Sequence, residues 1–157
     1  MAVLEELAKL SEARFLGMYQ ALSQQGYGPL DHEIARALKF RPHAIKKLPM
    51  ETRARRARAL VEGKQSTDLC YEFFGTYLVR TKKELVTGFL DRTGVAHQDG
   101  MIEDIDAKKP DPAKLAEAIR ELDSKFDPED VTLYLALCVE QWPGMSELAL
   151  AWKGRRA

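Results

Sequence analysis

The sequence predicts an all-α protein, a single compact multi-helix domain of about eight helices spanning residues 1–157. Apolar residues recur at helical spacing along nearly the whole chain, and no stretch shows the convincing alternation of a half-buried strand. Prolines, glycines and capping side chains separate these helical segments at short intervals. One segment, residues 128–142, is apolar on almost every side, which is typical of a helix at the centre of a core.

The composition is that of an ordinary globular protein, with 45% apolar and 31% charged residues. The longest uninterrupted apolar run covers residues 133–139, far short of the roughly 20 residues that cross a bilayer, so we expect no membrane span. The first residues lack the basic and apolar pattern of a secretory signal. Cys70 and Cys138 lie in apolar segments, which is typical of buried thiols rather than of a disulfide framework. Together these features predict a cytoplasmic protein with reduced cysteines.

The first elements follow from apolar spacing and breakers. Apolar residues that step by three and four predict one helix over residues 3–24, which Gly26 and Gly28 then end. Asp31 is expected to cap a short helix that carries apolar residues on one face.

Prolines determine the next boundaries. A short helix is expected over residues 42–48, because the residue before Pro42 disfavours helical geometry. Pro49 begins another helix over residues 50–62, which Gly63 ends. If the domain has two subdomains, their junction is predicted near residues 63–66.

Capping signals organise the second half of the chain. After a strongly apolar helix, Thr81 and Glu84 have the spacing of a capping box, and Gly94 is expected to end the helix that they begin. Asp111 and Asp127 each precede a proline, the pattern of an N-cap followed by proline in the first helical turn.

Charge is unevenly distributed although the net charge is zero. Residues 39–64 hold nine basic and two acidic residues, nine minus two or +7, whereas residues 99–130 hold eleven acidic and five basic, or −6. Such asymmetry can indicate an anionic partner, two segments that face one another within or between molecules, or simply a solvated, salt-bridged helix face.

Inside the basic segment, the residues EIARALKFRPHAIKKL resemble a helix-turn-helix, the unit whose second helix enters the DNA major groove. The resemblance covers residues 31–62 and rests on six apolar positions: Ile34, Ala35, Leu38, Phe40, Ile45 and Leu48. Lys39 stands where such units usually have glycine, and a lysine at positive φ costs roughly 1 kcal/mol or more. The resemblance implies base contacts from the first four, and phosphate contacts from the last four, of these residues: Arg41, His43, Lys46, Lys47, Arg53, Arg55, Arg56 and Arg58.

The acidic loop HQDGMIEDID is the candidate metal site. Its oxygen and imidazole ligands would come from His97, Asp99, Glu103, Asp104 and Asp106. The spacing matches neither a calcium loop nor a helical zinc motif, so an exposed acidic loop is the favoured interpretation. The chain also lacks a phosphate-binding loop, a dinucleotide fingerprint and a recognisable catalytic triad, and we expect no cofactor.

Three functional hypotheses remain. The first is a non-enzymatic helical interaction or regulatory protein that acts through an unknown protein partner, with a homodimer also compatible. The second is a nucleic-acid-binding protein that uses residues 31–62. The third is a small enzyme or metal-binding protein that uses the loop over residues 97–106. The interaction hypothesis predicts an apolar surface patch rimmed by charge.

Overall fold

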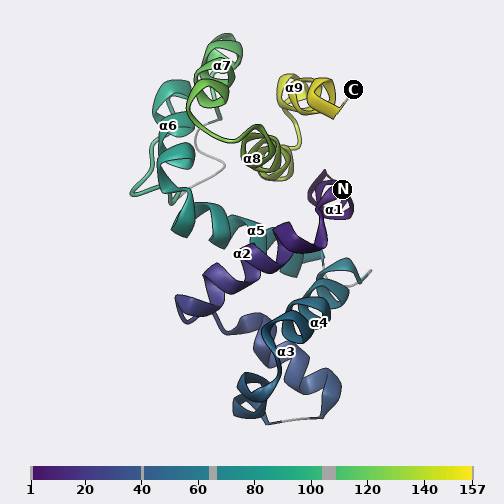
Figure 1. Cartoon of the computed structure of the whole chain (residues 1–157). Coiled ribbons are helices and arrows are strands. Elements are labelled where there is room, and N and C mark those ends of the chain that lie inside the picture. Colours follow the sequence, from purple (N-terminus) through teal and green to yellow (C-terminus); the bar gives the residue numbers. More distant parts are fainter. Residues whose placement is uncertain (1, 40, 64–66, 104–108, 157) are drawn as a thin grey trace. The chain divides into compact units, whose positions relative to one another are not determined.

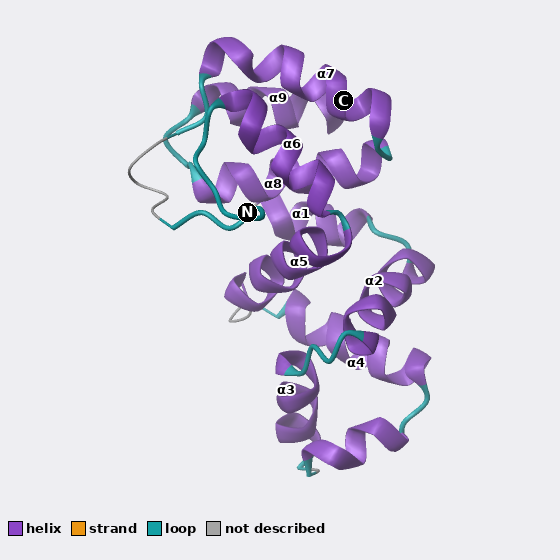
Figure 2. Ribbon diagram, turned by 90° about the vertical axis from the view of Figure 1, so that its left-hand side faces the viewer, coloured by secondary structure: helices purple, strands orange, loops and turns teal. Residues whose placement is uncertain are grey.

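The computed structural model describes residues 2–39, 41–63, 67–103 and 109–156. Within these ranges the regular structure consists of nine α-helices and two 3-10 helices. Figures 1 and 2 show the ribbon with its α-helices labelled. The pairing of Gln98 with Met101 is an isolated bridge outside any strand. The predicted all-α class is therefore confirmed. No helix in the described part of the chain has both the length and the apolar character needed to cross a bilayer.

Helix packing divides the chain into two units. The N-terminal unit comprises Leu4–Phe73, and the C-terminal unit comprises Met1–Val3 with Phe74–Ala157. The division falls inside α5 (Thr67–Thr81) rather than in a loop. Most of the predicted junction, residues 64–66, lies outside the described residues, and the single-domain hypothesis remains a prediction.

The N-terminal unit is built on two neighbouring helices, α2 (Glu12–Gln24) and α4 (Met50–Glu62). The Phe15 and Phe73 rings pack against one another in its core, with centroids 5.1 Å apart and planes tilted by 33°. The remaining elements are α1 (Ala2–Lys9) from Leu4 onward, α3 (Pro29–Leu38), the 3-10 helix η1 (Pro42–Lys47) and the first half of α5.

The prediction of one helix over residues 3–24 is wrong. α1 ends at Lys9, and Ser11 caps α2 by accepting a hydrogen bond from the Arg14 amide at 3.1 Å. Ser11 lies within the apolar pattern that predicted one helix, but it also has the side chain of a good N-cap. Its hydrogen bond to the start of α2 outweighs the apolar pattern, and the helix is interrupted there. The extra break explains why the described ranges contain nine α-helices instead of about eight.

The N-terminus of α3 also differs from the prediction. Gly28 occupies the N-cap position and Pro29 the first turn, whereas Asp31 lies inside the helix. Asp31 does not cap because its carboxylate accepts hydrogen bonds from the Tyr19 hydroxyl and the Arg53 guanidinium. After α3, Lys39 adopts the left-handed conformation with φ 58° and ψ 34°, the geometry usually given to glycine at a helix C-terminus.

The C-terminal unit packs its helices around α8 (Pro128–Gln141). Between Asp130 and Cys138 every side chain of α8 except Thr132 is buried, so the predicted apolar central helix is present. The Phe89 ring lies edge-on to Tyr134, with centroids 5.2 Å apart. The surrounding elements are α6 (Lys83–Thr93), η2 (Pro112–Lys114), α7 (Leu115–Lys125) and α9 (Ser146–Arg156).

Most capping predictions hold in this unit. Asp111 and Asp127 accept hydrogen bonds from backbone amides two residues on, at 3.0 and 2.9 Å, and Gly94 ends α6 with φ 77°. The capping box of Thr81 and Glu84 does not form. Thr81 is the last residue of α5, and its hydroxyl donates to the Tyr77 carbonyl within that helix instead.

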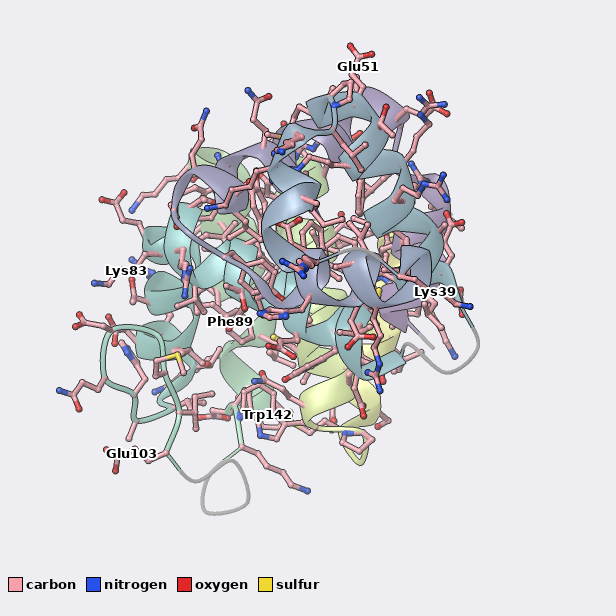
Figure 3. The ribbon with its side chains drawn as sticks, turned by 90° about the horizontal axis from the view of Figure 1, so that it is seen from below. Lys39, Glu51, Lys83, Phe89, Glu103 and Trp142 are labelled. Atoms are coloured by element: carbon pink, nitrogen blue, oxygen red, sulfur yellow. The ribbon has the colours of Figure 1, made fainter. Side chains whose placement is uncertain are left out.

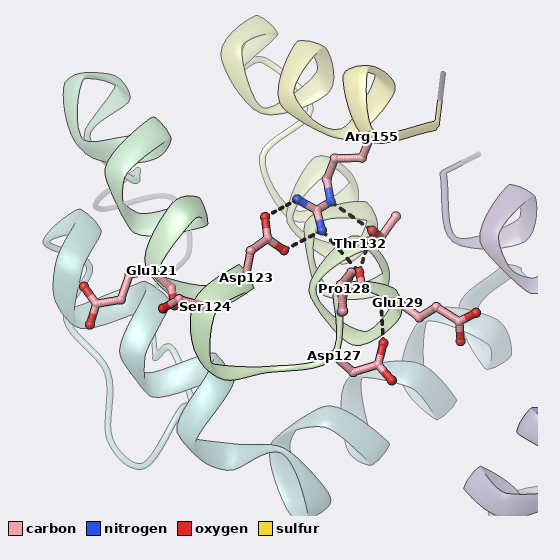
Figure 4. Close-up of polar contacts among 8 residues, drawn as sticks. All are labelled: Glu121, Asp123, Ser124, Asp127, Pro128, Glu129, Thr132 and Arg155. Carbon is pink, nitrogen blue, oxygen red and sulfur yellow. Dashed lines mark hydrogen bonds and ion pairs between the residues drawn. The ribbon is translucent and has the colours of Figure 1, made fainter.

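A guanidinium group joins three helices of the C-terminal unit (Figure 4). Arg155 of α9 donates two parallel hydrogen bonds to the Asp123 carboxylate of α7, each 2.7 Å long. It also donates to the Thr132 hydroxyl at 2.9 Å and to the Pro128 carbonyl at 3.2 Å, both in α8. This clamp fixes the C-terminal helix to the end of α7 and to the first turns of α8.

Candidate functional site

The candidate recognition helix is η1, a 3-10 helix of six residues. With about 2.0 Å of rise and three residues per turn, it is only about 12 Å long and presents two turns. Ile45 faces the core, whereas Arg41, Lys46 and Lys47 are exposed. Phe40 and the side chains of Leu38 and His43 lie outside the described residues. The helix-turn-helix interpretation remains a prediction, and its second helix is short and not α-helical.

Arg53 is held inside the N-terminal unit. Its guanidinium donates to Ser23 Oγ at 3.0 Å and to Asp31 Oδ2 at 3.3 Å, and it lies over the Tyr19 ring. Burial, together with the hydrogen bond to Asp31, raises the pKa of the Tyr19 hydroxyl above its usual value. Because its side chain is only 9% exposed, Arg53 joins α2, α3 and α4 rather than facing solvent.

Arg58 is also held by internal contacts. One nitrogen, Nη2, donates to the backbone carbonyls of Leu7 and Leu10, both at 2.9 Å, and thereby satisfies the C-terminus of α1. Nε donates to Glu62 at 2.9 Å, and the group lies over the Phe15 ring. Arg58 therefore fastens α1 and α2 to α4.

Five predicted contact residues have exposed side chains without a hydrogen bond or ion pair to any described residue: Arg41, Lys46, Lys47, Arg55 and Arg56. A count of charges cannot distinguish them from Arg53. The helical period does distinguish Arg53 from these exposed residues, because Arg53, Ala57 and Val61 follow one another at intervals of four on the buried face of α4.

A cavity of about 620 Å³ lies along α4 beside the end of α1 and the first turns of α2. Its apolar lining is made of Leu10, Ala13, Phe15, Leu16, Ala54 and Ala59. Its charged lining consists of three carboxylates and two guanidinium groups: Glu12, Glu51, Glu62, Arg55 and Arg58. Glu51, at the start of α4, points outward in Figure 3. We call this feature the α2–α4 groove.

Apolar periodicity in the sequence does not reveal the groove, for a physical reason. Its walls come from segments about 40 residues apart, and three of its apolar side chains are alanines, which carry little weight in a periodicity argument. The available signal was the stripe of Glu51, Arg55 and Glu62, which the helical period places on one side of α4.

No known protein family matches this chain, and neither does any curated protein or solved structure. Its function is therefore inferred from its own geometry.

The acidic loop after α6 does not bring its predicted ligands together. The Gly100 amide donates to His97 Nδ1 at 3.0 Å, so Nε2 carries the proton that is shared with Asp91 Oδ1 at 2.6 Å. Both ring nitrogens are thus engaged. Asp99 pairs instead with Lys83 at 3.1 Å, and Glu103 is exposed (Figure 3).

Two other predicted ligands, Asp104 and Asp106, lie outside the described residues. Among the residues that the structure does describe, no three His, Cys, Asp or Glu side chains are grouped as metal ligands would be. Both cysteines are buried, and burial raises the pKa of the Cys138 thiol to about 12.

Proposed function

We propose that this chain is a non-enzymatic helical interaction module that binds an α-helical segment of a protein partner in the α2–α4 groove. The observation that carries the proposal is an apolar lining rimmed by charge along two neighbouring helices. Helix-in-groove recognition uses such a surface, because the apolar face of the bound helix enters the groove while its polar residues meet the rim.

The dimensions of the groove favour a helix as the occupant. Its lining runs along α4 from Glu51 to Glu62, eleven positions or about 16 Å at 1.5 Å per residue. That length matches three turns of a bound helix. Ala13, Ala54 and Ala59 are short side chains, which allow another helix to approach closely.

Apolar residues elsewhere on the described surface are scattered. The large apolar side chains that are exposed are Met101, in the loop after α6, and Leu150, in α9. Single exposed apolar residues are ordinary for a soluble surface, whereas a concave cluster with a charged rim indicates a binding site.

Site-specific photo-crosslinking tests the proposal. A photoreactive amino acid replaces Ala59 in the groove, and a matched control replaces Ala116, an exposed alanine of α7. In the cells that produce the protein, we expect an adduct only from position 59, mapped by mass spectrometry to one amphipathic segment of one protein. Ala13→Gln should abolish that adduct, because a longer polar side chain then fills the groove.

Equal adducts from positions 59 and 116, or an adduct that persists in the Ala13→Gln protein, would contradict the proposal. Ala13 is exposed, so this substitution should leave the fold intact, and far-UV circular dichroism checks that it does.

A second candidate function is binding to nucleic acid. It is favoured by the five exposed basic side chains that lack ion pairs to the described residues, among them Lys46, Lys47 and Arg56. Anisotropy titrations with duplex DNA and RNA should then show affinity that falls steeply with salt. The triple variant Lys46→Ala, Lys47→Ala, Arg56→Ala should reduce both the affinity and the salt slope. Salt-independent or absent binding would remove this candidate.

A further inference from the structure

We infer that the helix bound in the α2–α4 groove carries charges in the order basic, acidic, basic, separated by four and seven positions. This inference rests on the proposed function, since it describes the partner of the same groove. It follows from the order of charges along α4.

The three charges of α4 that line the groove lie on one narrow stripe. At 100° per residue, Arg55 is rotated by about 40° from Glu51, and Glu62 by about 20°. Along the axis, Arg55 lies about 6 Å beyond Glu51, and Glu62 about 10 Å beyond Arg55. All three line the same cavity, which agrees with this placement.

The two charges nearest the start of α4 are available to a partner. Glu51 and Arg55 are exposed and make no hydrogen bond or ion pair to the described part of the chain. At the other end, Glu62 Oε1 accepts from Arg58, but the Glu62 side chain remains 50% exposed.

Glu12 adds a second carboxylate to the Glu62 end. It follows Leu10 by two residues, and the Leu10 carbonyl is bound by the same Arg58 guanidinium that contacts Glu62. Glu12 is exposed, lines the groove and has no ion pair to a described residue. The groove is therefore acidic at both ends and basic between them, with three carboxylates against two guanidinium groups.

Two helices that lie side by side have the same rise per residue, so charge spacings transfer from one to the other. A partner parallel to α4 carries Lys or Arg at position i, Asp or Glu at i+4, and Lys or Arg at i+11. An antiparallel partner carries the same charges at i, i+7 and i+11. Between these charged positions, apolar residues of the partner helix at helical spacing pack against the alanines that line the groove.

A library of helical peptides tests this charge order. Each peptide has 15 residues with leucine at the inward positions, and positions i, i+4 and i+11, or i, i+7 and i+11, vary among Lys, Glu and Gln. We expect the full-length protein to enrich Lys–Glu–Lys in one of the two spacings. By anisotropy, a labelled peptide of that order should bind at least about tenfold more tightly than its Glu–Lys–Glu counterpart, since three ion pairs differ between the two peptides and each exposed pair contributes up to about fivefold.

Charge-reversed proteins identify the contact. Arg55→Glu should change the preferred residue at the middle position from Glu to Lys, while the matched control Arg56→Glu, on an exposed neighbour that does not line the groove, should leave the preference unchanged. An unchanged preference in the Arg55→Glu protein would overturn the inference.

The remaining outcomes separate the two proposals. If helical peptides bind in a manner that Ala13→Gln abolishes but are indifferent to charge, the charge order is wrong and the groove function stands. If no helical peptide binds, both are wrong. Dimerisation in analytical ultracentrifugation that Ala13→Gln abolishes would identify a second copy as the occupant and would overturn the inferred partner.

Discussion

Replacing Arg155 with methionine should destabilise the C-terminal unit by about 2 kcal/mol. The side chain is 16% exposed and makes four hydrogen bonds, two of them parallel and charge-assisted, to Asp123. Hydrogen bonds to charged groups contribute about 1.5–3 kcal/mol when buried, and exposed ion pairs about 0–1 kcal/mol. Asp123 is one-third exposed, so water can hydrate its carboxylate once the guanidinium group is removed. The expected loss therefore lies near the middle of the range given for hydrogen bonds to charged groups. Methionine retains most of the aliphatic contact.

Tryptophan fluorescence during urea unfolding reports on this unit directly. Both tryptophans of the chain, Trp142 and Trp152, are buried in the C-terminal unit. The matched control is Arg120→Met, because Arg120 is exposed on α7 and has no ion pair to a described residue. An Arg155→Met protein whose unfolding free energy lies within about 0.5 kcal/mol of the control would refute the clamp, since surface substitutions usually stay inside that limit.

Three further outcomes are expected. Lys39→Gly should raise the free energy of unfolding by about 0.5–1 kcal/mol in circular dichroism, because the left-handed backbone is strained for lysine; no gain would show that the turn is not left-handed. The hydrogen bond from Lys125 holds the pKa of the Glu121 carboxyl below its ordinary value of 4.5. The ionised Glu121 therefore stabilises the folded protein fully above pH 4.5, and this stabilisation is lost as the pH falls through the lower pKa of the folded state. The stability deficit of Glu121→Gln should accordingly shrink on acidification, and a constant deficit in urea titrations would contradict this. Cys70 and Cys138 are buried, and a thiol reagent at pH 8 should modify them only on unfolding; rapid modification of native protein would contradict their burial.

Local rules predicted much of the fold because many signals act over short distances. Asp111, Asp127 and Gly94 terminate helices through bonds to residues within one turn, so their roles depend little on the rest of the chain. The buried α8 was predictable for a similar reason, since a helix that is apolar on all sides has to be covered.

The errors arose where a distant residue competes with a local rule. Asp31 has the side chain of a good N-cap, yet it bonds Tyr19 and Arg53 from neighbouring helices. Arg53 was likewise expected among the surface charges, although the helical period places it on the buried face of α4, where it binds partners on α2 and α3. The groove could not be predicted as a whole either, because α2 and α4 are brought together only by tertiary packing.

The break between α1 and α2 depends partly on a residue that is synthesised late. The Leu10 carbonyl is bound by Arg58, 48 residues further along, although Ser11 also caps α2 locally. At roughly 5–20 residues per second, translating that distance takes about 2–10 s, whereas a helix forms within about a microsecond. During this interval Ser11 can already cap α2, whereas the Leu7 and Leu10 carbonyls at the end of α1 still lack the guanidinium group that binds them in the folded protein. The contacts that hold α1 against α2 and α4 are thus expected to be completed only when α4 arrives, which makes assembly of the groove a late event in the folding of the newly made chain.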